Sequence, residues 1–370
     1  MATSTQTGFL SIEGLRRLEN LLRQAGYRVF APKAEDGAIQ YRELESMAQL
    51  PWGVRQTQAP GEYRLQYQDT PRAFAWANGP QALKPALFAP TETLWRVTRD
   101  ETGALDFTPA TPRQQQPLAV IGVRSCDLAA LELQDRHFLG GEADPQYAAR
   151  RENLLLVAVN CSHPADTCFC AGTGDGPAAE QGYDLLMDEL DEGFVIRSGS
   201  EAGRELFQRL APAEVSDQQF ELITRQQQQA AERQQRTLPG RDLQRPLFAN
   251  LDHPRWQEVG ERCLACGNCT AVCPTCFCHS EMEMPALEGD AGEHIRQWDS
   301  CFTQGHSYIH GKTLRAEIPQ RYRQWLTHKL GSWHEQFGRS GCVGCGRCIS
   351  WCPVGIDITE EAHAICGGDQ

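Results

Sequence analysis

The sequence predicts an α+β protein of several domains, with an N-terminal α/β domain followed by a C-terminal α-helical domain. Its 370 residues are enough for two or three domains that each bury a core. Continuous apolar segments alternate with helical patterns in the first half, whereas most of the 16 cysteines lie beyond residue 250. We therefore expect an α/β domain over 1–210, a helical Gln-rich connector over 211–250 and a cysteine-rich helical domain over 251–370.

The β-rich segments of the first part predict the strands of the α/β domain. They are YRVFAP (27–32), TLWRVT (93–98), PLAVIGV (117–123) and NLLLVAVN (153–160). The last two are continuous apolar runs, as expected of strands covered on both faces. Between them, residues 126–139 show a helical pattern with Asp127 near its start, where a carboxylate favours a helix N-terminus. The simplest interpretation is strand, helix, strand.

Residues 214–244 are rich in Gln, Arg and Glu, which predicts a helical connector, with a disordered linker as the alternative. In the third part, helical patterns surround Trp256 and extend over 321–338. The aromatic residues of these helices are expected to pack a core around bound metal.

Charge and apolar patterning exclude several classes of protein. The chain has 35 Lys and Arg against 48 Asp and Glu, a formal charge of −13, which disfavours nucleic acid as a partner. Residues 1–20 lack the basic and apolar regions of a secretory signal. The apolar run 154–159 is far shorter than the roughly 20 residues that span a bilayer. We expect a cytoplasmic protein without membrane insertion, a compartment in which cysteines bind metal more often than they form disulfides.

Two copies of one cysteine motif dominate the third part. CLACGNCTAVCP (263–274) and CVGCGRCISWCP (342–353) both follow the pattern C-x2-C-x2-C-x3-C-P. Zinc ribbons pair C-x2-C knuckles in twos, whereas three cysteines at three-residue steps wrap one cuboidal cluster and take the fourth ligand from a distance. The motifs predict two [4Fe-4S] clusters. The long insertion between them, 275–341, favours an α-helical ferredoxin-like domain over the short β-containing type.

The spacing also predicts which cysteines share a cluster, because the last cysteine of each such motif ligates the other cluster in two-cluster ferredoxins. The first set is Cys263, Cys266, Cys269 and Cys352. The second set is Cys342, Cys345, Cys348 and Cys273. This exchange places the two clusters close together, which suits electron transfer.

The remaining cysteines leave more than one interpretation open. Those of the first domain follow two predicted parallel strands, where ligands collect in open α/β sheets, and could hold a third cluster: Cys126, Cys161, Cys168 and Cys170. The alternatives are free thiols or zinc. A further group could hold a fourth cluster with one outside ligand, or could surround the clusters and tune their potentials: Cys276, Cys278 and Cys301. Cys366 is expected to be a free cysteine.

Catalytic machinery is not evident in the sequence. The segment AGTGDGP (171–177) lacks the Walker lysine and the GxGxxG spacing, so we expect a loop. His279, His306 and His328 belong to no HExxH motif and are expected at the surface or around the clusters. There is no nucleophile elbow and no dinucleotide-binding fingerprint. No catalytic residue is therefore predicted.

The order of motifs resembles a known family. GVRSCDL, NCSHPADTCFC, CLACGNCTAVCPTCFC, WDSCF, RYRQWLTHK and CVGCGRCISWCPVGID occur in this order. The chain is thereby similar to a dicluster iron–sulfur family. That family includes the beta subunits of soluble NAD(P)-linked nickel–iron hydrogenases (sulfhydrogenases) and the iron–sulfur subunit of anaerobic sulfite reductases. The resemblance extends over most of the chain, to Asp357.

The resemblance implies an electron-transfer subunit of a larger oxidoreductase complex. Its expected place is between a flavin subunit that handles NAD(P)H and a nickel–iron hydrogenase catalytic subunit. The iron–sulfur subunit of an anaerobic sulfite reductase complex is the alternative within the family. The resemblance also favours a joint role for the four cysteines of the first domain, since the family has cysteines at matching places. A stand-alone iron–sulfur reductase and a purely structural use of clusters are the alternatives from other classes.

Overall fold

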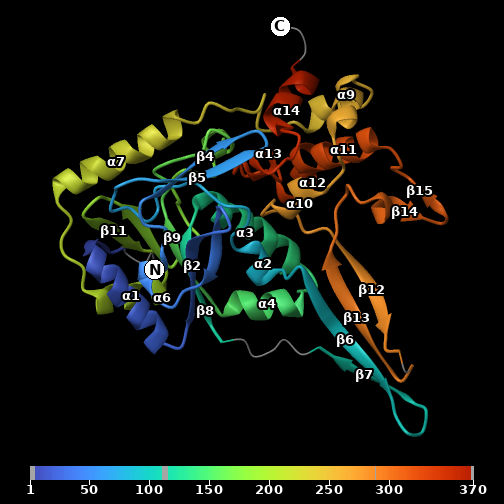
Figure 1. The fold of residues 1–370 in the computed structure, drawn as a ribbon, viewed down its shortest axis with the longest axis horizontal. Helices are drawn as coiled ribbons and strands as arrows, with labels where there is room; N and C mark the ends of the chain where they lie inside the picture. Colours follow the sequence, from blue (N-terminus) through green and yellow to red (C-terminus); the bar gives the residue numbers. More distant parts are fainter. Residues whose placement is uncertain (1–4, 111–115, 288, 368–370) are drawn as a thin grey trace.

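A seven-stranded mixed sheet forms the body of the computed structural model, which describes residues 5–110, 116–287 and 289–367 (Figure 1). The strand order is β1-β11-β10-β9-β8-β2-β3. The four middle neighbours β10, β9, β8 and β2 run parallel, and the outer pairs are antiparallel. The strands are β1 (Thr7–Ser11), β2 (Arg28–Glu35), β3 (Ala38–Glu43), β8 (Leu118–Val123), β9 (Leu154–Val159), β10 (Leu185–Glu189) and β11 (Gly193–Ser198).

Apolar runs that are buried on both faces form the centre of this sheet. All but the first residue of β8 and β9 are buried, and every residue of β10 is buried. The strands expected at 27–32, 117–123 and 153–160 are confirmed, as is the helix at 126–139, which is α3 (Ser125–Phe138). Other helices of this part are α1 (Ile12–Gln24), α2 (Lys84–Leu87), α4 (Pro145–Glu152), α5 (Cys170–Thr173) and α6 (Glu201–Leu210). The N-terminal part is therefore a mixed α/β structure.

Helix α6 packs on the sheet and begins at a side-chain cap. Ser200 Oγ accepts a hydrogen bond from the Gly203 amide at 3.0 Å and donates one to Asp184 Oδ1 at 2.5 Å. We expect Ser200→Ala to lower the opening free energy of α6 by about 1 kcal/mol. Amide hydrogen exchange in α6 should then be about fivefold faster by mass spectrometry. Gln208→Ala, an exposed change on the same helix, is the control and should leave exchange unchanged.

A second, four-stranded sheet projects from the body in the order β12-β13-β6-β7 (Figure 1). Its strands are β6 (Thr91–Arg99), β7 (Leu105–Pro109), β12 (His279–Pro285) and β13 (Ala291–Trp298). Strand β6 matches the strand expected at 93–98. The hairpin β12–β13 corrects the expected boundary of an α-helical C-terminal domain, because residues between the two cysteine motifs form strands that pair with a strand of the first part.

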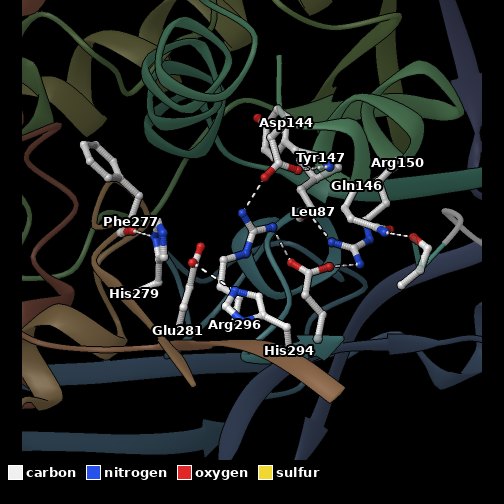
Figure 2. A network of polar contacts seen from close by, with 12 residues as sticks. Leu87, Asp144, Gln146, Tyr147, Arg150, Phe277, His279, Glu281, His294 and Arg296 are labelled. Carbon is white, nitrogen blue, oxygen red and sulfur yellow. Dashed lines mark hydrogen bonds and ion pairs between the residues drawn. The ribbon is translucent and has the colours of Figure 1, made fainter. Parts of the chain in front are cut away.

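Buried ion pairs fix the base of this sheet to the body, as Figure 2 shows. Arg296 of β13 donates to Asp144 and, at 2.5 Å, to Glu92 Oε1. Arg150 of α4 donates to Glu92 Oε2 at 2.6 Å and to the Leu87 carbonyl at 2.9 Å. Burial opposes ionisation of Asp144, but Arg296 and backbone amides outweigh it and hold its pKa below the usual value. The network makes the projecting sheet continuous with the N-terminal body.

The C-terminal part has a separate helical core. Trp256, Tyr322, Trp325 and Leu326 are buried in it, which confirms that the aromatic residues of these helices pack a core. The Gln-rich segment begins with helix α7 (Asp217–Glu232), as predicted. The other helices are α8 (Gln244–Ala249), α9 (Arg255–Arg262), α10 (Asn268–Ala271), α11 (Ile318–Thr327), a π-helical turn (His328–Ser332), α12 (Trp333–Phe337), α13 (Arg347–Ser350) and α14 (Ile358–Cys366).

Two small hairpins complete the fold. They are β4 (Val54–Ala59) with β5 (Glu62–Tyr67), and β14 (Tyr308–Ile309) with β15 (Lys312–Thr313). Gly61, at the tip of the first hairpin, donates its amide to the Ile349 carbonyl at 3.1 Å. This hairpin therefore joins the N-terminal part to the second cysteine motif. Among the described helices, none is long and apolar enough to cross a bilayer.

Candidate metal centres

The first predicted set of cysteines surrounds one hollow in the C-terminal core. Cys263, Cys266, Cys269 and Cys352 line this hollow, which has a volume of about 450 Å³ counting the space open to solvent. Cys269 lies on α10, which begins after Gly267. That glycine has a φ of 77°, a left-handed conformation that residues with a Cβ rarely adopt. The local turn thus brings three cysteines of one motif to the cavity, and Cys352 enters from the other motif.

Unpaired donors in the wall of this hollow fit a sulfide-containing cluster. The wall is otherwise apolar, and Tyr322 and Trp325 contribute to it. Tyr322 Oη and Trp325 Nε1 are buried and have no hydrogen-bond partner within the described parts of the chain. A buried donor without a partner costs about 1–3 kcal/mol. A cluster in the hollow would offer sulfur acceptors to such donors, and hydrogen bonds to sulfur are one determinant of cluster potential.

The second predicted set also gathers at one place. The pKa of Cys348 is raised well above its usual value, first by burial and then by Cys342, Cys345 and Cys273, so these four thiols are close neighbours. Helix α13 carries Cys348 and begins after Gly346, whose φ is 74°. Cys348 also lines the hollow of the first set, so the two sets are adjacent.

A buried lysine accompanies the second set. Lys329 Nζ lies 3.5 Å from Cys273 Sγ and donates to Thr275 Oγ1 at 2.7 Å. Its residue is 3% exposed. Burial opposes its charge, but Cys273, Cys276 and Cys342 outweigh this and raise the pKa of Lys329. Lys329 lies in the π-helical turn that follows α11, a deviation from helix geometry that is frequent at functional sites.

The four cysteines of the N-terminal part are brought together as well. Cys126 lies at the start of α3 after β8, and Cys161 follows β9. Cys168 lies in the loop that follows, and Cys170 is the first residue of α5. All four are buried. After burial, Cys170 and Cys161 raise the pKa of Cys168, and Cys345 and Cys170 contribute to the raised pKa of Cys126. The group lies at the carboxyl ends of neighbouring parallel strands, where the sequence places it.

This N-terminal group touches the second set. Asn78 Nδ2 donates to the Cys345 carbonyl at 2.7 Å and lies 4.0 Å from Cys168 Sγ. On the other side, Gln234 Nε2 lies 3.4 Å from Cys170 Sγ. The three groups of thiols therefore form a continuous series, with the second set between the other two.

Burial makes thiolate formation unfavourable at cysteines of all three groups. It raises the pKa of Cys170 and of Cys342 to about 12, and that of Cys269 well above its usual value. The thiolate is the form that binds metal, so bound iron would have to compensate for the cost of ionising these residues. Deprotonation and cluster insertion are therefore coupled in this fold.

The three further cysteines of the insertion divide between two places. Cys276 neighbours Cys273, and their interaction lowers the pKa of Cys273 and raises that of Cys276. Cys301 instead neighbours Cys278, which contributes to raising its pKa to about 12 after burial. Cys278 and Asp299 raise the pKa of His306 to about 9, and His306 Nδ1 hydrogen-bonds with Asp299 Oδ2 at 2.7 Å. Cys366 lies apart at the end of α14, and burial raises its pKa to about 11.

Charged residues join the thiol groups to the surrounding fold. Arg347 of α13 pairs with Asp127 of α3 at 2.8 Å, and both side chains are 1% exposed. Arg124 donates to the carbonyls of Trp76 and Phe74 and packs over the Trp76 ring. The sequence analysis placed Asp127 at a helix N-terminus but predicted no contact between it and Arg347, and it gave no role to Arg124. The sequence did contain signals for three of these charged residues. Asp127 and Arg347 each lie directly beside a cysteine, and Lys329 is a lysine at a helix position where the spacing predicts a buried residue.

In the described residues, no three His, Cys, Asp or Glu side chains gather tightly enough to hold one metal ion. A four-iron cluster, in contrast, distributes its cysteines over four iron atoms.

The fold and the two cysteine motifs define an iron–sulfur protein with two [4Fe-4S] clusters. Residues 262–356 match the family of 4Fe-4S dicluster domains. The expected resemblance to sulfhydrogenase beta subunits is also confirmed. The chain is 26% identical over 352 residues to sulfhydrogenase 2 subunit beta of Pyrococcus furiosus, which covers 94% of this chain and 95% of that protein. No solved structure matches the chain.

Proposed function

We propose that this chain is the iron–sulfur electron-transfer subunit of an oxidoreductase complex. Its place would be between a flavin subunit that binds NAD(P)H and a nickel–iron hydrogenase catalytic subunit. The observation that carries the proposal is the continuous series of three thiol groups, from Cys126 through Cys345 to Cys352. The name of the Pyrococcus relative, a sulfhydrogenase beta subunit, supports the hydrogenase partner over a sulfite reductase.

We infer the following ligands. The first cluster is held by Cys263, Cys266, Cys269 and Cys352, and the second by Cys342, Cys345, Cys348 and Cys273. A third is held by Cys126, Cys161, Cys168 and Cys170. When bound, such clusters accept and release one electron at a time. Cys276 supports the second cluster through its contact with Cys273, and Lys329 adds a positive charge there.

Side chains of this chain shield the series of thiol groups from solvent. Buried aromatic and aliphatic side chains such as Trp333 and Val343 enclose the cysteines, and the third group is almost completely buried. Exclusion of water keeps competing reactions away from reduced metal. The exposed Cys266 marks the side on which an electron could enter or leave the first set.

Iron and acid-labile sulfide analysis tests the cluster count. Twelve cysteines in three groups should hold about twelve irons and twelve sulfides per anaerobically prepared chain. About eight irons would contradict the third site while leaving the dicluster domain intact. In a matched experiment, Cys168→Ser should remove about four irons, whereas Cys366→Ser should remove none.

The partners are tested by purification of the native complex. A nickel-containing polypeptide and a flavoprotein should co-purify with the chain. A sirohaem protein in place of the nickel-containing polypeptide would contradict the hydrogenase assignment and favour the sulfite reductase alternative. Turnover of a substrate by the isolated chain with an artificial donor would instead indicate a stand-alone reductase.

A further inference from the structure

A basic pocket lies beside the N-terminal thiol group and takes no part in the function proposed above. It is enclosed by β4, by the turn between β10 and β11 and by α7, and measures about 950 Å³ counting the space open to solvent. Four arginines line it, namely Arg55, Arg72, Arg225 and Arg233. They come from three separate parts of the sequence, so the fold assembles the pocket.

The positive charge of this pocket is only partly neutralised. Arg72 donates to Asp191 Oδ1 and to Gln226 Oε1 at 2.6 and 2.7 Å, which fixes its position. In the described ranges, Arg55, Arg225 and Arg233 make no ion pair, and Asp191 and Glu192 are the only carboxylates that line the pocket. Four arginines thus face two carboxylates in a chain whose net charge is −13. Like charges gathered in this way repel each other unless an anion separates them.

The arginine side chains of the pocket suit one class of ligand. Arg55 Nε itself is inaccessible to solvent, so an ion in the pocket would be bound through the terminal Nη atoms of the guanidinium groups. Arginine forks match the oxygens of tetrahedral oxyanions and form strong, charge-assisted hydrogen bonds with them. Ser162, 4% exposed, adds a hydroxyl to the pocket lining.

The pocket is directly connected to the third group of thiols. Ser162 and His163 line the pocket and follow Cys161 in the chain. Burial raises the pKa of the Cys161 thiol, and Arg124 and the neighbouring His163 backbone partly offset that rise. An ion bound in the pocket would therefore lie close to any cluster that Cys161 holds.

We propose that this pocket binds an oxyanion of sulfate or phosphate type that carries at least two negative charges. Arg55 and Arg233 hold the ion. Arg225 adds positive charge at the opening of the pocket, and Arg72, whose hydrogen bonds fix its position, forms part of the pocket wall. Binding itself does not depend on the third cluster. A second consequence rests on the proposed function: negative charge beside Cys161 disfavours reduction of the neighbouring cluster and lowers its potential.

Isothermal titration calorimetry of the full chain with sodium sulfate, and separately with sodium phosphate, tests binding. Chloride keeps the ionic strength constant. We expect one saturable site per chain. The double variant Arg55→Gln, Arg233→Gln should bind at least about tenfold more weakly, since charge-assisted hydrogen bonds are lost. Arg225→Gln, an exposed change, should weaken binding severalfold without risk to folding. Arg16→Gln, on α1 far from the pocket, should bind as the parent chain does.

Adenosine 5′-monophosphate distinguishes the source of the anion. Tighter binding of the nucleotide than of inorganic phosphate would indicate the phosphate group of a larger ligand, and equal or weaker binding would indicate a free ion. Absence of saturable binding, or unchanged affinity in folded Arg225→Gln and double variants, would overturn the proposal.

A redox titration followed by electron paramagnetic resonance tests the coupling separately. Sulfate should lower the midpoint of one centre in the parent chain and leave it unchanged in the double variant. If iron analysis shows no third cluster but sulfate still binds, the anion site stands and the third cluster fails. If the third cluster is present and sulfate neither binds nor shifts a midpoint, the anion site fails alone.

Discussion

The variant Cys345→Ser is expected to interrupt electron flow between NAD(P)H and the terminal acceptor in the complex. Cys345 belongs to the second set and also touches Asn78 and the third group, so it lies at the middle of the series of thiols. A serine oxygen is a poor substitute for a thiolate on iron, so this centre should be lost or altered. We expect the rate of electron transfer through the complex to fall by about tenfold or more, while assembly of the chain is retained.

The measurement combines iron analysis of the variant chain with NAD(P)H-dependent activity of the reconstituted complex. Cys366→Ser is the matched control, because Cys366 lies outside the three groups and should affect neither quantity. Unchanged activity of the complex, with the second cluster shown to be absent, would exclude a relay through this set. Loss of all clusters would instead show that Cys345 is needed for folding, and Cys348→Ser would then serve as the second variant.

Local sequence patterns were sufficient for three strands of the N-terminal sheet, β2, β8 and β9, but not for its other four. β8 and β9 are six-residue apolar runs, and such runs specify buried strands without knowledge of their neighbours. The hairpin β12–β13 could not be predicted in the same way. Its partner β6 lies almost 200 residues away, and β12 is largely exposed, so little buried apolar surface marks it as a strand. Strand pairing over such a separation is decided by the tertiary fold.

The candidate sites were likewise predictable only where local sequence spacing determines them. Three of the four predicted ligands of each motif cluster follow from the spacing within one motif, and the structure places both exchanged cysteines near the other three of their predicted sets. The environment of the sulfur atoms depends on distant residues. Lys329 meets Cys273 across 56 positions, and Asp127 meets Arg347 across 220. The sequence marks these residues as unusual, but it does not show which distant residue each one meets, so the contacts themselves were not predictable.

Lys329→Met should lower the reduction potential of the second cluster. Reduction adds negative charge to a cluster, and a buried cation 3.5 Å from the Cys273 sulfur stabilises the reduced form. At an effective dielectric constant near 20, a neighbouring unit charge contributes about 1–3 kcal/mol. At roughly 59 mV per 1.4 kcal/mol for one electron, this predicts a midpoint lower by about 40–130 mV. Methionine matches the length of lysine and should keep the packing against Trp333.

A redox titration of the isolated chain, followed by electron paramagnetic resonance, measures this midpoint. Lys312→Met removes an equal charge from exposed strand β15 and should leave every midpoint unchanged, because solvent screens that charge. An unaltered midpoint in Lys329→Met, with full iron content, would show that the lysine only fills space beside Thr275. A shift in Lys329→Met alone would identify Lys329 as the residue that makes the middle centre of the series easier to reduce.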